Sequence, residues 1–263
     1  DIALELCNFV PKFLRLRKIK ISAVSYLNTL PFIYGIEQHP SFLDQIMLSK
    51  DIPSVCAEKL IKKEVDLGLV PAAVIPELEE AHIVSDFCIA ANGKVESVLL
   101  LSEVPINQVS TIYLDYQSRT SVKLCQLLVR DFWKLKINFI SSEKGYEKKI
   151  GGKVAGVVIG DRTFHLAENY PYRYDLAEEW KKWQGLPFVF AAWVSNTELP
   201  KSFLEQFNQV LSFGVHRIPE AIQHYNLKEI EPKTQKKYLQ ESIDYHLDIN
   251  KKEALTTFLQ LVK

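Results

Sequence analysis

The sequence predicts an α/β fold of two lobes, with an interlobe cleft and a helical C-terminal tail. Short apolar runs alternate with amphipathic stretches from residue 19 to residue 194, a pattern typical of largely parallel sheets covered by helices. Two segments, 103–105 and 186–194, fall where the chain is expected to cross between the lobes. Beyond Pro200 the sequence has helical periodicity without a strand signal, so the tail is expected to pack on the first lobe.

In the first lobe, apolar runs predict strands and a two-faced pattern predicts a helix at 54–63. Pro31 lies near the first turn of a further helix, where its missing N–H costs nothing. The strands at 83–90 and 97–101 are expected to be neighbours, because the residues between them are turn formers. The strands of this lobe are predicted at Ile19–Val24, 45–49, 66–71, 83–90 and 97–101.

In the second lobe, the amphipathic segment 120–132 predicts a helix. The run at 186–194 is almost wholly apolar and rich in strand formers, which predicts a strand buried on both faces. The remaining strands are predicted at Thr111–Leu114, 137–140 and Val154–Ile159, and the tail helices at 201–216, 219–225 and 235–263.

These elements divide the chain into a first lobe of residues 19–103 and 196–263, a second lobe of residues 104–195, and an N-terminal extension of residues 1–18. Two lobes joined by two crossings, with a helical tail on the first, describe the periplasmic-binding-protein-like fold. Ligands in such folds lie between the lobes, at the carboxyl ends of strands. Hinges near 103–105 and 194–196 are expected to let the lobes close.

Composition and charge exclude several classes of protein. The 263 residues include 32 Lys and Arg and 32 Asp and Glu, so the sequence lacks the basic footprint of a nucleic-acid partner. Residues 1–18 are too few for a helix-turn-helix, so a transcription-factor effector domain ranks last among the alternatives. No apolar run reaches the roughly twenty residues needed to cross a bilayer, which indicates no membrane partner and a cytoplasmic protein.

The cysteines and histidines suggest neither a metal site nor an acid–base centre. Cys7, Cys56, Cys88 and Cys125 are widely separated, with no C-x-x-C pair, so free buried thiols in a reducing compartment are expected. Leu4–Cys7 only faintly resembles a lipoprotein cleavage site. The six histidines lie in no nucleophile or metal motif, and no Gly-rich phosphate loop occurs.

Three stretches place small hydroxyl or amide side chains where a predicted strand passes into a helix or loop. They are residues 24–32, 95–98 and 118–121. The first turn of a helix has unpaired N–H groups and partial positive charge, so carboxylates and phosphates bind there, and Asn, Ser and Thr add further donors. The sequence therefore predicts a cleft for a small anion.

Each candidate residue has a structural explanation beside the functional one. Asn28 either donates and accepts hydrogen bonds in the cleft or caps a helix, and Ser97 either binds the ligand or satisfies a nearby backbone group. Arg119 either forms a bidentate pair with a carboxylate or points to the surface. Asp161, after Gly160, either faces the cleft or caps a helix. Ser118, Thr120 and Ser121 either cap the helix that they begin or bind an anion.

Six strings occur in register from about residue 19 to residue 193. They are VSYLNTLPF at 24–32, DLGLVP at 66–71, GKVESV at 93–98, SRTS at 118–121, GD at 160–161, and DL…W…GLPFVFAAW within 175–193. Together they resemble the chorismate dehydratase family of the futalosine route to menaquinone. The resemblance covers most of the chain, while the tail contributes only helical character.

The resemblance implies removal of water from chorismate to give 3-[(1-carboxyvinyl)oxy]benzoate, without a metal or an organic cofactor. It makes Asn28 the catalytic candidate, and it places Tyr26, Ser97, Arg119 and Asp161 among the substrate-binding candidates, together with Ser118, Thr120 and Ser121. Two alternatives remain open. One is the related dihydroxynaphthoate synthase, which uses a histidine base, and the other is a binding protein that holds a small carboxylate without converting it.

Overall fold

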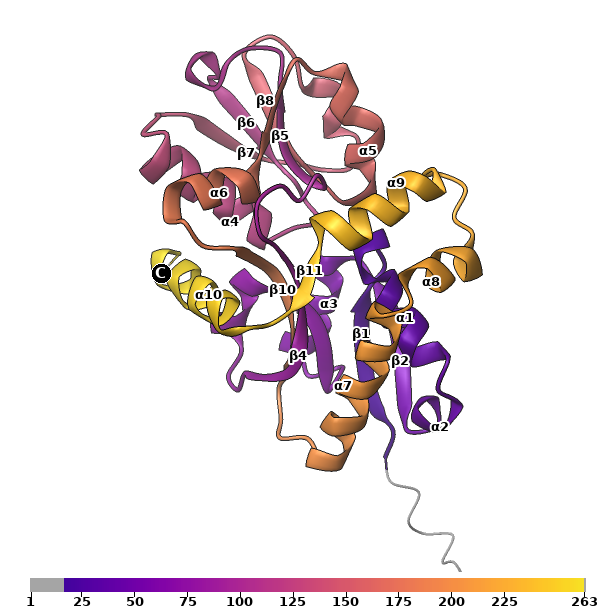
Figure 1. Ribbon diagram of the computed structural model, residues 1–263. Coiled ribbons are helices and arrows are strands. Elements are labelled where there is room, and N and C mark those ends of the chain that lie inside the picture. Colours follow the sequence, from indigo (N-terminus) through magenta and orange to yellow (C-terminus); the bar gives the residue numbers. More distant parts are fainter. Residues whose placement is uncertain (1–16, 263) are drawn as a thin grey trace, which may run out of the picture.

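The computed structural model describes residues 17–262, whose strands form a six-stranded and a five-stranded sheet. The strand orders are β11-β4-β10-β3-β1-β2 and β7-β6-β8-β5-β9. In Figure 1 the first sheet lies in the lower lobe and the second in the upper lobe. Cys7, the segment Leu4–Cys7 and most of the predicted extension 1–18 lie outside the described residues.

The first sheet is mixed. Its strand β1 is parallel to β2 and β3, whereas β10 runs antiparallel to β3 and β4, and β11 is antiparallel to β4. The expectation of largely parallel sheets is therefore wrong for the half of this sheet that is formed by β10, β4 and β11. The strands are β1 (Ile19–Val24), β2 (Ile46–Asp51), β3 (Leu67–Pro71), β4 (His82–Ala91), β10 (Phe188–Ser195) and β11 (Asp244–His246).

The second sheet has a parallel part, β7-β6-β8, and an antiparallel part in which β5 pairs with β8 and β9. Its strands are β5 (Val98–Ser102), β6 (Thr111–Leu114), β7 (Asn138–Ser141), β8 (Val154–Ile159) and β9 (Tyr172–Asp175). Strand β9 and the helix after it, α6, were not among the expected elements. Asp175 begins that helix by accepting bonds from the backbone of Ala177 and Glu178.

The helices cover both sheets, and the longest belong to the tail (Figure 1). They are α1 (Leu30–Glu37), α2 (Pro40–Leu43), α3 (Pro53–Ile61), α4 (Thr120–Leu127), α5 (Thr163–Leu166), α6 (Leu176–Gln184), α7 (Lys201–Val215), α8 (Ile218–Tyr225), α9 (Pro232–Lys237) and α10 (Ile249–Leu261). α4 and α9 each continue into a π-helical turn, at Leu128–Phe132 and Tyr238–Ser242. Within residues 17–262, no helix is long and apolar enough to span a bilayer.

The two strands expected to be neighbours, 83–90 and 97–101, lie in different sheets. The chain changes sheet at residues 92–97, before β5, and returns at 185–187, before β10. The expected boundaries at 103 and 195 therefore assign β5 and β10 to the wrong sheets. The turn residues at 91–94 do not place the two strands side by side, because they turn the chain toward the second sheet, where β8 and β9 supply the hydrogen bonds of β5. That the lobes move as units stays a prediction.

The tail also contains a strand, so the expectation of a continuous helical segment at 235–263 is wrong. β11 forms the edge of the first sheet beside β4, and helices α9 and α10 flank it (Figure 1). The strand has only three residues, two of which pair with β4, and their own sequence has no apolar run. The exposed edge of β4 supplies the partner that makes this segment a strand.

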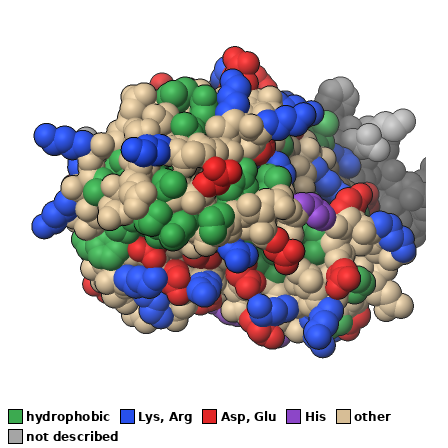
Figure 2. Space-filling view, turned by 90° about the horizontal axis from the view of Figure 1, so that it is seen from above, with side chains coloured by type: hydrophobic (Ala, Val, Ile, Leu, Met, Phe, Trp, Pro, Cys, Tyr) green, Lys and Arg blue, Asp and Glu red, His purple; other side chains and the backbone are tan. Residues whose placement is uncertain are grey.

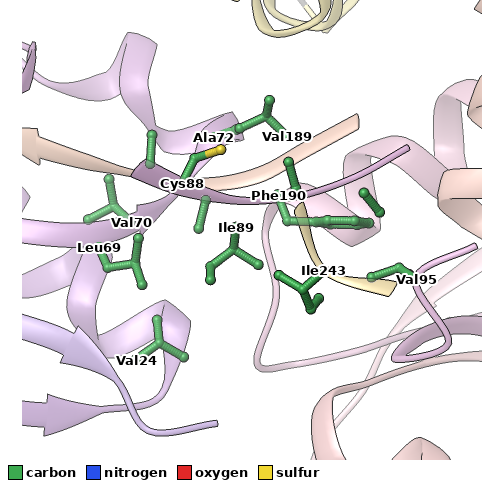
Figure 3. Close-up of a cluster of buried hydrophobic side chains, with 14 of the residues drawn as sticks. Val24, Leu69, Val70, Ala72, Cys88, Ile89, Val95, Val189, Phe190 and Ile243 are labelled. Atoms are coloured by element: carbon green, nitrogen blue, oxygen red, sulfur yellow. The ribbon is translucent and has the colours of Figure 1, made fainter. Parts of the chain in front are cut away.

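Two features show how closely the core of the first lobe is packed. Helices α1 and α7 touch at glycines, because a Cβ at Gly35 would lie 1.9 Å from the carbonyl oxygen of Val210, and one at Gly214 1.8 Å from that of Pro31. Apolar side chains of β1, β3, β4 and β10 meet at one end of the sheet (Figure 3).

As expected, Cys56, Cys88 and Cys125 are buried free thiols.

Charged side chains of both signs are interspersed on the face of Figure 2, which looks down on the second lobe. That pattern agrees with equal numbers of acidic and basic residues. The described part of the chain holds no group of three or more His, Cys, Asp or Glu side chains arranged to bind a metal ion.

Candidate functional site

A cavity lies between the two sheets, where the parallel strands of both lobes end. Val24 and Pro71 are the last residues of β1 and β3, and Ile159 is the last residue of β8. The cavity has a volume of about 60 Å³, or about 530 Å³ when the open space at its mouth is included. The cavity is therefore narrow in this conformation, and a ligand of several rings or carboxylates requires some opening of the lobes.

Apolar side chains form a large part of the cavity lining. Figure 3 shows Val24, Ile89, Val95 and Phe190, which line it, packed together with Ile243 of the tail. Polar residues form much of the rest of the lining, and they come from both lobes. They are Tyr26, Asn28, Thr29, Ser97, Ser118, Thr120 and Ser121. Six of the eight predicted site residues thus line a single cavity.

Asn28 lies in a short 3₁₀ turn, Leu27–Thr29, between β1 and α1. It caps no helix with its side chain, because neither this turn nor α1 has a side-chain capping bond. Thr29 Oγ1 donates to Asn28 Oδ1 at 3.1 Å, and the Tyr245 hydroxyl donates to the Asn28 carbonyl at 3.0 Å. With its carbonyl oxygen engaged, the Asn28 carboxamide has two N–H donors to offer a ligand.

The three hydroxyl residues at the start of α4 all line the cavity, and two of them also accept hydrogen bonds from the backbone. Ser118, which precedes the N-cap residue of α4, accepts through Oγ from the backbone N–H of Ser121 at 3.0 Å and so satisfies one N–H of the first turn. Thr120 Oγ1 accepts from the backbone N–H of Ala73 at 3.1 Å, a bond that joins the second lobe to the first. Ser118, Thr120 and Ser121 are all buried, so a ligand that reaches them is shielded from water.

Tyr26 and Ser97 approach the cavity from opposite lobes. The Tyr26 hydroxyl donates to Gln117 Oε1, and its ring lies against Gly160, where a Cβ would come within 3.1 Å of the ring. Burial, with Asp115 nearby, raises the pKa of Tyr26 well above its ordinary value, so this phenol is a neutral donor. Ser97 Oγ accepts from the Tyr238 hydroxyl at 2.7 Å.

Arg119 and Asp161 do not line the cavity. Arg119 Nη1 pairs with Glu77 Oε2 at 2.8 Å, and its side chain is 41% exposed, which is the surface orientation weighed above. Asp161 accepts from the backbone N–H of Leu27 at 3.2 and 3.3 Å and lines a neighbouring cavity. Burial raises the pKa of this carboxyl, although the Leu27 N–H acts in the opposite direction. Both residues bridge the two lobes.

Four residues that support the site were not singled out as candidates. Tyr238 and Tyr245 come from the tail, and Gln117 and Asp175 from the second lobe. The Asp175 carboxylate accepts from the N–H groups of Val95 and Glu96 at 2.9 and 2.7 Å, and so holds the segment before Ser97. Burial raises the pKa of Asp175 to about 6, while these backbone bonds lower it. Only Asp175 had a sequence signal, because it begins the DL…W string.

The lining contains no Lys, Arg or His among the residues that the structure describes. A bound anion would therefore be held by hydroxyl, amide and backbone N–H donors rather than by a cation. Such donors are worth more in an enclosed apolar site than in water, because the local dielectric constant is low. The apolar part of the lining and this donor set together fit a small, partly apolar carboxylate.

Solved structures share this architecture. A protein of Archaeoglobus fulgidus superposes with a TM-score of 0.76 at 15% identity, covering 94% of this chain and 97% of that one. A Candida albicans protein described as having the generic periplasmic binding protein fold gives 0.62 at 12% identity, covering 94% and 90%. The alkanesulfonate-binding protein SsuA of Xanthomonas axonopodis pv. citri gives 0.60 at 15%, covering 92% and 89%. The predicted fold class is confirmed.

Two sequence relatives match this protein over most of the chain. A chorismate dehydratase of Campylobacter jejuni is 28% identical over 251 residues, covering 91% of this chain and 96% of that protein. A chorismate dehydratase of Thermus thermophilus is 24% identical over 225 residues, covering 73% and 80%. The family model described as menaquinone biosynthesis matches residues 19–263. The chain therefore belongs to the menaquinone biosynthesis family.

Proposed function

We propose that this protein is a chorismate dehydratase, a hydro-lyase that removes water from chorismate to give 3-[(1-carboxyvinyl)oxy]benzoate. The observation that carries the proposal is the single cavity that collects Asn28 with hydroxyl groups of both lobes and apolar side chains. The two chorismate dehydratases that resemble the chain over most of its length support the same reaction. A cytoplasmic location stays a prediction.

The chemistry requires little from the protein besides positioning and stabilisation of charge. Breaking the ring C–H bond beside the ether leaves an electron pair that is delocalised toward the ring carboxylate. Loss of the neighbouring hydroxyl then makes the ring aromatic, and that hydroxyl leaves as water with the proton. We assign the proton's acceptor to the substrate's own side-chain carboxylate, held in a reactive conformation by the closed lobes.

In this mechanism Asn28 orients the departing hydroxyl or the carboxylate that takes the proton. Ser97, Thr120 and Ser121, with backbone N–H groups at the start of α4, hold the carboxylates and stabilise the charge that develops on the ring carboxylate. Val95 and Phe190 exclude water from the reacting face. The two alternative functions differ from this one, because dihydroxynaphthoate synthase requires a histidine base in the cavity and a binding protein requires no reaction.

Dihydroxynaphthoate synthase uses a histidine base, and no histidine lines the cavity within residues 17–262. A binding protein would hold the anion without converting it. Incubating the purified chain with chorismate separates these possibilities, with products followed by chromatography and mass. We expect loss of one water at a rate far above the protein-free control. Saturable binding of chorismate without any product would instead identify a binding protein.

Arg119 offers a test of which residues contact the substrate. Because it pairs with Glu77 outside the cavity, Arg119→Gln is expected to change kcat/KM for chorismate by no more than about five-fold, since an exposed ion pair contributes about 0–1 kcal/mol. Ser121→Ala, at a buried position in the lining, is expected to raise KM by more. A larger loss of kcat/KM in Arg119→Gln than in Ser121→Ala would show that Arg119 contacts the substrate.

A further inference from the structure

Residues of the tail form hydrogen bonds to Glu96 and Ser97, at the end of the segment 92–97 that connects the two sheets, next to the cavity. Lys237 Nζ and Ser242 Oγ donate to the Glu96 carboxylate at 3.0 and 2.8 Å, and the Tyr238 hydroxyl donates to Ser97 Oγ at 2.7 Å. Glu96 has a φ of 63°, a left-handed conformation that a residue other than glycine keeps only when its surroundings hold it. Ser97 therefore follows a strained residue that the tail keeps in place.

Tyr238 begins the π-helical turn Tyr238–Ser242 and is 1% exposed. Its ring packs edge to face on Phe164 of the second lobe, with centroids 5.0 Å apart. Burial raises its pKa well above the ordinary value, while the Ser97 and Asn28 side chains act in the opposite direction. The phenol is therefore un-ionised near neutral pH and keeps its proton to donate.

The same part of the tail also fixes Asn28. The Tyr245 hydroxyl donates to the Asn28 carbonyl at 3.0 Å, and the Asn28 side chain lies near enough to the Tyr238 hydroxyl to influence its titration. Tyr238 is thus placed between the catalytic candidate of the first lobe and a binding candidate at the start of the second sheet.

A serine hydroxyl has one proton and two acceptor positions. Where Tyr238 occupies one acceptor position of Ser97 Oγ, the Ser97 proton remains for a third group, and the incoming bond makes it a stronger donor. We propose that Tyr238 is a positioning residue, which orients the Ser97 hydroxyl so that its proton is donated to a substrate carboxylate in the cavity. This inference rests on the proposed function.

The test is a double-mutant cycle with chorismate as substrate. Tyr238→Phe keeps the ring and removes the hydroxyl, and it is expected to lower kcat/KM by about ten-fold, mainly through KM. In a Ser97→Ala background the same change is expected to have an effect of less than about two-fold, because Tyr238 acts through Ser97. In a Ser97→Thr background, which keeps a hydroxyl, Tyr238→Phe is again expected to lower kcat/KM by about ten-fold.

Tyr174→Phe is the matched control. The Tyr174 hydroxyl accepts from the backbone N–H of Ile106 at 2.8 Å, away from the cavity lining, so its removal is expected to change kcat/KM by less than about two-fold. Melting temperatures report whether each variant folds. Failure of Tyr238→Phe to fold, kinetics like those of the unmodified protein, or an effect that multiplies in full with Ser97→Ala would overturn the inference.

The reference assay separates this inference from the assignment on which it rests. If the unmodified protein gives no product from chorismate, the proposed function fails, and the inference fails with it. If the unmodified protein is active and Tyr238→Phe matches it, only the positioning role is removed.

Discussion

Replacing Asn28 with Asp is expected to lower kcat/KM for chorismate by about 100- to 1,000-fold, the loss typical of removing one donor to a developing anion. The change removes two N–H donors and places a carboxylate beside a substrate that carries two carboxylates of its own. Thr29 Oγ1 still has an oxygen to donate to, so the turn Leu27–Thr29 keeps its local bond. The variant should therefore fold normally while losing turnover.

Two comparisons separate charge from loss of the donor. Asn28→Ala removes the donors without adding charge, and it is expected to be impaired less than Asn28→Asp, because like charges repel strongly where water is excluded. Asn138→Asp makes the same chemical change at an exposed position of β7 and is expected to alter kcat/KM by less than about two-fold. Unchanged kinetics in Asn28→Asp would remove Asn28 from the mechanism.

Replacing Asp175 with Ala is expected to lower the free energy of unfolding by about 2–4 kcal/mol at pH 8. The carboxylate caps α6 through Ala177 and Glu178 and also accepts from Val95 and Glu96. Loss of a helix cap costs about 1 kcal/mol, and each buried N–H left without a partner costs about 1–3 kcal/mol. Part of this cost is offset, because the variant no longer buries a charge.

Asp248→Ala is the matched control, because Asp248 also caps a helix, α10, through the backbone N–H of Lys251. Its carboxylate is 47% exposed and also pairs with Lys251 Nζ at 2.6 Å, but Lys251 keeps its second partner Asp244 at 2.6 Å, so a loss of about 1–2 kcal/mol is expected. Urea unfolding of both variants measures the difference. Equal losses would show that the bonds to Val95 and Glu96 add nothing to stability. A raised KM in Asp175→Ala would link the same bonds to Ser97.

The strands at the centre of the fold were predictable because their signal is local. β1, β6 and β8 begin and end at the residues that the sequence predicts, because most of the buried positions along each strand carry apolar side chains. β11 was not predictable in this way, because Asp244–His246 carries no apolar run and becomes a strand only beside β4. Sheet membership of β5 failed for the same reason, because pairing is decided by partners far along the chain.

The features of the site divide in the same way, into those with a local sequence signal and those that depend on contacts between distant segments. The sequence by itself determined the alternation of strands and helices and the hydroxyl and amide residues at strand ends, including Asn28 and Ser97. Those features depend on neighbouring residues and on the rule that ligands bind at carboxyl ends of strands. Only the tertiary structure decided that Arg119 turns outward to Glu77 and that Tyr238, 141 residues from Ser97 along the chain, donates to it. Such contacts depend on which distant segments the packed core brings together, and no local pattern encodes that choice.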